Sequence, residues 1–281
     1  MRNIQNPGSA LGEAIGSQME QALNNFLDTL CEELGYHFIS ASVIDGKKKL
    51  LMYDQFGTAF NIDAMIANAS MQPIILFESK YIRYKKHNRD KGSWLCTAHP
   101  AIRRRYQSIR SSIAVLAGNW SSSSLAMMRS FDINIFLIPF ERICELLAHH
   151  EIVFDWDEKD RMTAREAWEH YSQLTEYQQR AIGEEMVALV KDDLRSLIGR
   201  ILDDSVKRDI EKVTIELHSN LGEVKIYEFG SVAEAVEFLN SEELKDVFLT
   251  IDSLTLFDPP PEIGYANGEE HSHKEESIGK V

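Results

Sequence analysis

The stretch Gln72-Pro73-Ile74-Ile75-Leu76-Phe77-Glu78-Ser79-Lys80 organises the rest of the chain. Four consecutive apolar residues after a proline predict a short buried strand. Residues two apart on a strand share a face, so the Glu78 carboxylate and the Lys80 ammonium project together from the end of that strand. Burying charges is costly unless something pairs them, and their presence here therefore indicates that the site uses them.

The composition is that of an ordinary globular protein. The 281 residues are 44% hydrophobic and 26% charged, and Cys31, Cys96 and Cys144 show no metal-ligand spacing. Scattered cysteines favour a reducing cytoplasm, and the sequence has neither a secretion leader nor an apolar run of about 18 residues. We expect a cytoplasmic protein without a membrane segment, large enough for one or two domains.

Positive charge is concentrated in one stretch of an acidic chain. The net charge is −14, yet residues 80–110 contain Asp90 as their only acid. The basic residues there are Lys80, Arg83, Lys85, Lys86, Arg89, Lys91, Arg103, Arg104, Arg105 and Arg110. Aromatic residues suited to stacking on bases lie among them, namely Tyr81, Tyr84, Trp94 and Tyr106. A solvated surface would explain the charges alone; the aromatics favour a nucleic-acid site.

Two acidic residues accompany the predicted core elements. Apolar residues recur at helical spacing over residues 11–34, which predicts a helix that Ser9 caps at its start and Gly35 ends. Glu20 lies at the edge of the apolar stripe, either facing solvent or turned into a site. Residues 36–44 and 59–67 read as strands. Asp63 falls within the second and needs a metal, a cation such as Lys80, or hydrogen-bond donors beside it.

The remaining elements of the core follow the basic stretch. Residues 101–118, after His99-Pro100, are predicted to form a helix, residues 121–124 a flexible connector, and residues 133–140 a buried strand. The order helix, three strands, helix, strand predicts an α/β fold with a mixed central sheet flanked by helices.

The second half of the chain predicts accessory structure. Residues 163–201 carry a helical periodicity, interpreted as two helices meeting near Gly183 or further on. A small C-terminal α/β module follows, with a hairpin, a helix capped by Ser231 and a last strand at residues 247–251. The expected division is a core at 10–150, a helical and small α/β accessory region at 163–257, and a disordered tail at 258–281. Dimerisation, regulation and partner binding all remain open for the accessory region.

The predicted order, with Asp63 on the second strand and Glu78-Ser79-Lys80 on the third, resembles the PD-(D/E)XK nuclease superfamily, best known from type II restriction endonucleases. The resemblance implies a restriction-endonuclease-like core in which Asp63 and Glu78 bind Mg²⁺ and Lys80 orients or deprotonates the attacking water. Gly16-Ser17-Gln18-Met19-Glu20 matches a Gly-x-x-x-Glu pattern on the first helix of many members, so Glu20 is implied as a further catalytic acid and metal ligand. No proline precedes Asp63, a departure from the family pattern.

The same resemblance places Gln107 near the scissile phosphate. The expected nucleic-acid contacts are Arg83, Lys85, Lys86, Arg89, Arg103, Arg104, Arg105 and Gln107. Phosphodiester hydrolysis suits these residue types, because carboxylates hold Mg²⁺ and the ion lowers the pKa of its bound water.

We therefore expect a Mg²⁺-dependent DNA endonuclease, with a homodimeric type II restriction enzyme acting on double-stranded DNA as the favoured role. A repair, transposition or methylation-dependent nuclease is the next subclass. The alternative is a non-catalytic nucleic-acid-binding or interaction protein, in which Asp63, Glu78 and Lys80 form a structural cluster.

Overall fold

A computed structural model describes residues 6–44, 47–84, 88–157, 159–249, 255 and 258–259. The chain divides into two compact units, Met1–Asp203 and Asp204–Val281. The helices of the first unit are α1 (Pro7–Leu34), α2 (Asn88–Arg105), α3 (Ser122–Arg129), α4 (Phe140–Ala148), α5 (Arg161–Gln173), α6 (Glu176–Ala188) and α7 (Lys191–Leu202). Its strands are β1 (His37–Ser40), β2 (Ser42–Ile44), β3 (Lys47–Lys49), β4 (Leu51–Tyr53), β5 (Ala59–Asn61), β6 (Ala64–Ala67), β7 (Pro73–Ile82), β8 (Ser111–Gly118) and β9 (Ile133–Pro139).

A five-stranded sheet in the order β1-β6-β7-β8-β9 forms the centre of the first unit. The β1–β6 and β6–β7 pairs are antiparallel, whereas the β7–β8 and β8–β9 pairs are parallel. The short pairs β2-β3 and β4-β5 are inserted between β1 and β6. The predicted α/β fold with a mixed sheet flanked by helices is confirmed.

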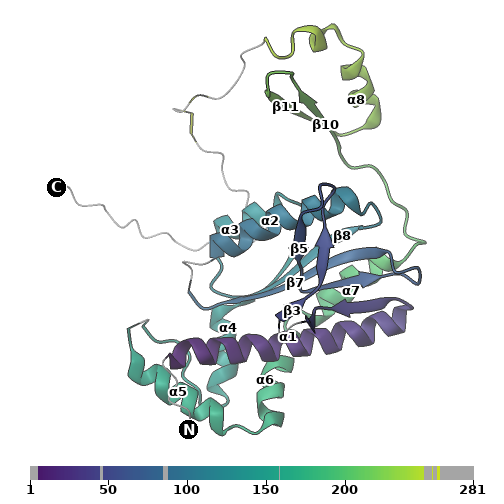
Figure 1. The fold of residues 1–281 in the computed structure, drawn as a ribbon. Coiled ribbons are helices and arrows are strands. Elements are labelled where there is room, and N and C mark those ends of the chain that lie inside the picture. The colour runs from purple at the N-terminus through teal and green to yellow at the C-terminus, as the bar shows by residue number, and fades with distance from the viewer. Residues whose placement is uncertain are drawn as a thin grey trace, which may run out of the picture. The chain divides into compact units, whose positions relative to one another are not determined.

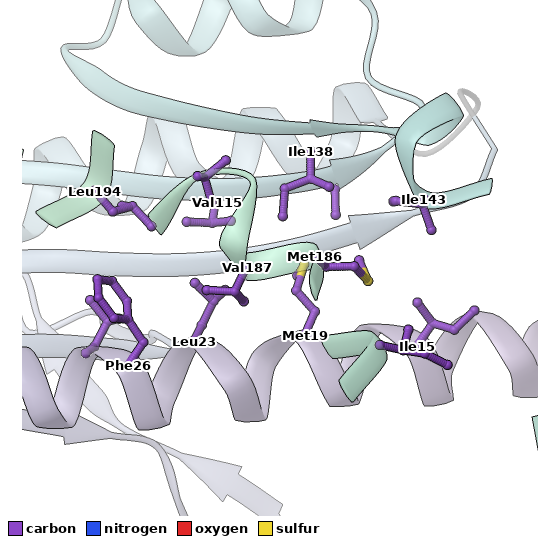
Figure 2. Close-up of a cluster of buried hydrophobic side chains, with 14 of the residues drawn as sticks. Ile15, Met19, Leu23, Phe26, Val115, Ile138, Ile143, Met186, Val187 and Leu194 are labelled. Carbon is purple, nitrogen blue, oxygen red and sulfur yellow. The ribbon is translucent and has the colours of Figure 1, made fainter. Parts of the chain in front are cut away.

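The sheet lies between two helical layers (Figure 1). On one face, Ile15, Met19 and Leu23 of α1 pack with Val115 of β8 and Met186 of α6, as Figure 2 shows. Burying each such side chain stabilises the fold by roughly 1.5–3 kcal/mol. On the opposite face, α2 and α3 pack on the sheet through a second cluster of buried hydrophobic residues. It contains Leu95, Cys96, Ala114, Leu116, Leu125 and Met128.

The ends of α1 are closed by local hydrogen bonds. Gly35 adopts a left-handed φ of 76°, and its backbone N–H reaches back to the last turn, as predicted. The N-cap is Asn6 rather than Ser9, because the Asn6 side chain accepts a hydrogen bond of 3.2 Å from the backbone N–H of Ser9.

The predicted helix over residues 101–118 is wrong. The helix is α2, which contains Pro100 and ends at Arg105, and residues 111–118 form β8, which is buried along its whole length. A parallel strand covered on both faces reads as a continuous apolar run, which is also compatible with a buried helix. Burial of Leu95, Ala98 and Ile102 of α2 outweighs the local preference for a helix boundary at proline.

The serine-rich residues 121–124 are not a flexible connector. Ser121 caps α3, since its side chain accepts a hydrogen bond from the backbone N–H of Ser124. The long periodicity of residues 163–201 forms α6 and α7 together with most of α5, and Gly183 lies inside α6 rather than between helices. A Cβ at Gly183 would lie 2.3 Å from the carbonyl oxygen of Gln18, so α6 crosses α1 closely there. These helices belong to the first unit, which differs from the expected division near residues 150–163.

The second unit contains β10 (Val213–His218), β11 (Val224–Phe229), α8 (Val232–Leu239) and a 3-10 helix (Glu242–Asp246). The predicted hairpin is confirmed by antiparallel pairing of β10 and β11. Ser231 caps α8 as predicted, accepting from the backbone N–H of Glu234. Residues 247–249 form a turn instead of the start of a strand; residues 250–251 and most of the expected tail at 258–281 lie outside the described residues.

Within the described ranges, none of the helices combines the length and apolar composition that a membrane crossing requires.

Candidate functional site

Adjacent strands bring Asp63 and Glu78 together. Asp63 occupies a bend immediately before β6, not the interior of a strand as predicted, and Ala64 pairs with Phe77 of β7. This register sets Asp63 beside Glu78, whose Oε1 accepts a hydrogen bond of 3.2 Å from the backbone N–H of Asp63. Alternation along β7 turns Glu78 and Lys80 to the face covered by α2.

The Lys80 ammonium joins the two carboxylates. Its Nζ lies 2.7 Å from Oδ2 of Asp63 and also contacts Oε2 of Glu78. The backbone N–H of Ser79 donates to the same Asp63 oxygen at 3.0 Å. Glu78 is completely buried, whereas the side chains of Lys80 and Asp63 keep 22% and 28% of their exposure. The cluster is therefore open to solvent on one side, and the expectation that these residues meet is confirmed.

The charge balance of this cluster shifts the pKa of its members. Burial and the adjacent Glu78 raise the pKa of Asp63, against the opposing effect of Lys80. Burial alone would lower the pKa of Lys80, but the carboxylates of Glu78 and Asp63 outweigh it and raise that pKa. Two carboxylates thus share one ammonium, and Lys80 is protonated at neutral pH.

His99 of α2 lies against the cluster, which the sequence did not indicate. Its Nε2 is 3.9 Å from Oε1 of Glu78, too far for a hydrogen bond. The ring is fully buried, and neither nitrogen has a partner among the described residues. Burial, with Lys80 and Arg103 nearby, lowers the pKa of His99 from 6.5 to about 3, so the imidazole is neutral.

Acid is expected to destabilise the protein through His99. In the unfolded chain the imidazole takes up a proton below its ordinary pKa of 6.5, whereas in the folded protein it does so only near 3. The unfolded state therefore binds more protons in this window, and stability falls as pH falls. Between pH 7 and pH 4.5, urea unfolding should show wild type losing about 2–3 kcal/mol more than His99→Leu. Equal losses in the two proteins would contradict this role.

The expected third acid, Glu20, lies on the helix that packs against the sheet. Glu20 is half-buried on α1 and lines a cleft with Ser79 and Lys91. In the described part of the chain, no three His, Cys, Asp or Glu side chains are grouped as a metal site. Glu20 as a metal ligand stays a prediction.

The expected nucleic-acid contacts occupy different positions. Arg89, Arg104 and Arg105 are exposed on α2, and Nη1 of Arg105 donates to the carbonyl of Asp54 at 3.0 Å. Gln107 is exposed in the turn after α2 rather than on a helix. Arg83 is buried, and so is not part of an exposed cationic stripe. Lys85 and Lys86 lie outside the described residues.

A hollow of about 520 Å³ extends the cationic surface. It is lined by Arg103 of α2, Arg129 of α3 and Arg110 beside β8, with Asp132 as its one acid. Because Arg129 comes from an element distant in sequence, only the fold shows that it lies beside Arg103 and Arg110.

Lys91 and Trp94 of α2 also border the cluster. Lys91 Nζ donates to the carbonyl of Tyr81 at 3.0 Å, and burial, together with the nearby Lys80, lowers the pKa of Lys91. The Lys80 ammonium lies 5.6 Å from the centre of the Trp94 ring, which is partly exposed. Both positions follow from the true start of α2 at Asn88, ahead of the start predicted at residue 101.

Comparison with known proteins does not assign the chain to a family. No family model matches the chain, and no curated protein matches it. Among solved structures, the crystal structure of a protein of unknown function, AF1548, aligns with 65% of this chain and 99% of that chain, at 10% identity and a TM-score of 0.30. A similarity at this level carries no argument about fold or function.

Proposed function

We propose that the chain is a Mg²⁺-dependent endonuclease that hydrolyses phosphodiester bonds in double-stranded DNA, with the role of a type II restriction enzyme. The observation that carries the proposal is the convergence of Asp63 and Glu78, from neighbouring strands, on one positive charge. Two carboxylates that contact the same ammonium also repel each other unless a cation lies beside both, so the arrangement favours cation binding.

The order of elements supports the resemblance to the PD-(D/E)XK superfamily. With the inserted pairs β2-β3 and β4-β5 set aside, the order is α1, β1, β6, β7, α2 and β8. The antiparallel β1-β6-β7 and the parallel β8 after α2 agree with the helix, three strands, helix, strand order of that core. Glu78 and Lys80 lie on the third of these strands, as in the family pattern, while Asp63 immediately precedes the second strand instead of lying within it.

The donors present fit a hard divalent cation. Asp63 and Glu78 would hold Mg²⁺ through carboxylate oxygens, the donors that this ion prefers, and water would complete its shell. Bound Mg²⁺ supplies positive charge beside the scissile phosphate and a water of lowered pKa. Because the Lys80 ammonium uses the same oxygens, it competes with a cation for them.

Lys80 acts in this proposal as a charged positioning group. Its raised pKa keeps the ammonium protonated, so it donates hydrogen bonds to the attacking water or to a phosphate oxygen instead of accepting a proton. The Lys80 ammonium lies over the Trp94 ring, 5.6 Å from its centre, so the ring contributes a cation–π attraction. The exposed Arg104 and Arg89 and the arginine-lined hollow are the proposed contacts to the DNA backbone. Cutting both strands requires two such sites, which supports a homodimer.

Removing the charge of one carboxylate is expected to weaken cation binding. Calorimetric titration of wild type with Mg²⁺ should show binding that weakens at least about 10-fold in Asp63→Asn, because one of two charged ligands becomes neutral. Asp132→Asn makes the same change at an exposed acid outside the cluster and should bind as wild type does. Equal affinity in Asp63→Asn would remove the metal from the proposal.

A second candidate is a non-catalytic nucleic-acid-binding protein. The observation in its favour is that Lys80 already satisfies both carboxylates, so the cluster needs no metal to persist. This candidate predicts DNA binding that weakens steeply with salt and needs no divalent ion, together with no Mg²⁺ binding at Asp63 and Glu78.

A further inference from the structure

A cleft of about 740 Å³ lies on the face of β7 opposite Glu78 and Lys80. Its floor is formed by Ser79, Tyr81 and Arg83, which alternate with the cluster residues along the chain. The N-terminal half of α1 forms one wall, and Arg161 and Ala164 at the start of α5 form another. The proposed nuclease chemistry uses none of these residues; Glu20, predicted from the sequence as a metal ligand, also lines the cleft.

Arg83 is the unusual member of the floor. The residue is 7% exposed, and its Nη2 donates to the carbonyls of Phe154 at 2.9 Å and Trp156 at 3.2 Å. The guanidinium lies 3.4 Å from the centre of the Trp156 ring. Its Nε and Nη1 are buried without a hydrogen-bond partner, and no carboxylate forms an ion pair with it among the described residues. Asp155 attracts the guanidinium without forming an ion pair with it, so the cost of burying this charge is only partly offset and the site favours a further anion.

Helix ends add positive potential at the same place. A Cβ at Gly8 would lie 3.7 Å from Nη1 of Arg83, which places the guanidinium against the first turn of the long helix α1. The N-terminus of a helix carries partial positive charge, which here has the same sign as the arginine. Arg161, the first residue of α5, adds an exposed cation.

The acids of the cleft are either engaged in hydrogen bonds to neutral groups or distant from this end. Asp160 is engaged as the N-cap of α5, accepting from the backbone N–H groups of Met162 and Thr163. Glu13 accepts a hydrogen bond from the Ser9 hydroxyl at 3.4 Å. Glu20 lies twelve residues beyond Gly8, about 18 Å along the helix axis. The positive groups at this end are therefore the first turn of α1, Arg83 and Arg161, with Asp160 and Glu13 as the acids nearest in sequence to them, while Glu20 lies further along α1.

We propose that this positive end is an anion site that accepts a phosphate monoester. Its cleft is far larger than a halide needs, and a guanidinium beside a helix N-terminus is the combination that recognises phosphate. The inference does not rest on nuclease activity, because it involves the other face of β7. The competing account gives Arg83 only a structural role, holding the segment Phe154–Trp156 by hydrogen bonds and stacking.

The test supplies the anion from within the protein. In Gly8→Asp, the new carboxylate would project beside Nη1 of Arg83 at a helix position that favours acids, with only ordinary contacts to its neighbours. Gly8→Asn is the matched neutral control. Calorimetric titrations with inorganic phosphate and with a 5′-phosphorylated oligonucleotide would be run in EDTA at constant ionic strength, alongside thermal unfolding of all three proteins.

Phosphate should bind wild type. The affinity for phosphate should fall at least 10-fold in Gly8→Asp and by less in Gly8→Asn. Of the two variants, Gly8→Asp should have the higher melting temperature. A 10-fold preference for the 5′-phosphorylated over the 5′-hydroxyl oligonucleotide would identify a strand end as the source; binding of inorganic phosphate alone would identify a small phosphate compound. Failure of wild type to bind either probe, or equal binding by Gly8→Asp, would overturn the site. Because EDTA prevents cleavage, neither result depends on the proposed nuclease.

Discussion

Replacing Lys80 with alanine is expected to slow DNA cleavage by about 10²- to 10⁴-fold while DNA affinity stays within a few-fold of wild type. The ammonium lies between the two carboxylates, 2.7 Å from Asp63, at the point where water and phosphate would meet. Its removal takes away an oriented donor and positive charge, yet leaves the exposed arginines of α2 unchanged. Single-turnover cleavage and equilibrium DNA binding, measured on the same preparation, separate the two effects.

The control for this prediction is Lys80→Arg, which keeps the charge but replaces a compact ammonium with a planar guanidinium. It should retain the fold and still cleave poorly. Lys80→Ala leaves the carboxylates of Asp63 and Glu78 side by side without a cation, which destabilises the protein. The assays should therefore be run well below the unfolding temperature of this variant. Cleavage by a folded Lys80→Ala at the wild-type rate would show that the cluster is structural.

Gly118→Ala is expected to destabilise the first unit by about 4 kcal/mol or more, the largest stability loss that we predict. Gly118 has a φ of 98°, and a Cβ there would lie 1.8 Å from the carbonyl oxygen of Ile82. That oxygen belongs to the backbone at the end of β7 and also accepts from the N–H of Asn119, so it cannot move away cheaply. The strand that carries Glu78 and Lys80 would be displaced with it.

Gly57→Ala is the matched control, because Gly57 has a φ of 88° but nothing within 4 Å of an added Cβ. It should cost only about 1–2 kcal/mol, the penalty of left-handed backbone alone. Thermal unfolding should therefore place Gly118→Ala about 8–16 °C below wild type and Gly57→Ala a few degrees below. Similar melting temperatures for the two variants would refute the close approach of β7 and β8.

The Asp63, Glu78 and Lys80 cluster could be predicted because short-range rules determine it. Alternation along β7 places Glu78 and Lys80 on one face, and an isolated acid in an apolar segment needs a cation close by. The bend at Asp63 could not be predicted, because it lies where the chain passes from the separate β4-β5 pair into β6 of the central sheet. Helix α1 was readable from its apolar periodicity and from Gly35.

Other residues of the site depend on contacts that no local pattern specifies. β8 is apolar on both faces because helices cover both sides of the sheet, and such a run cannot be told from a buried helix. The helix start expected after Pro100 left Lys91, Trp94 and His99 outside the predicted helix. Arg83 looked like one more basic surface residue, since only the fold shows Trp156 stacked upon it.

The most direct test of the proposed function is incubation of supercoiled plasmid with wild type and with Glu78→Gln, each in Mg²⁺ and in EDTA. The fully buried Glu78 contacts Lys80, so the neutral and nearly isosteric glutamine should keep the fold while removing the charge that a metal needs. The proposal predicts cleavage by wild type in Mg²⁺ only, and none by Glu78→Gln. Absence of Mg²⁺-dependent cleavage of both methylated and unmethylated plasmid by folded wild type would contradict it.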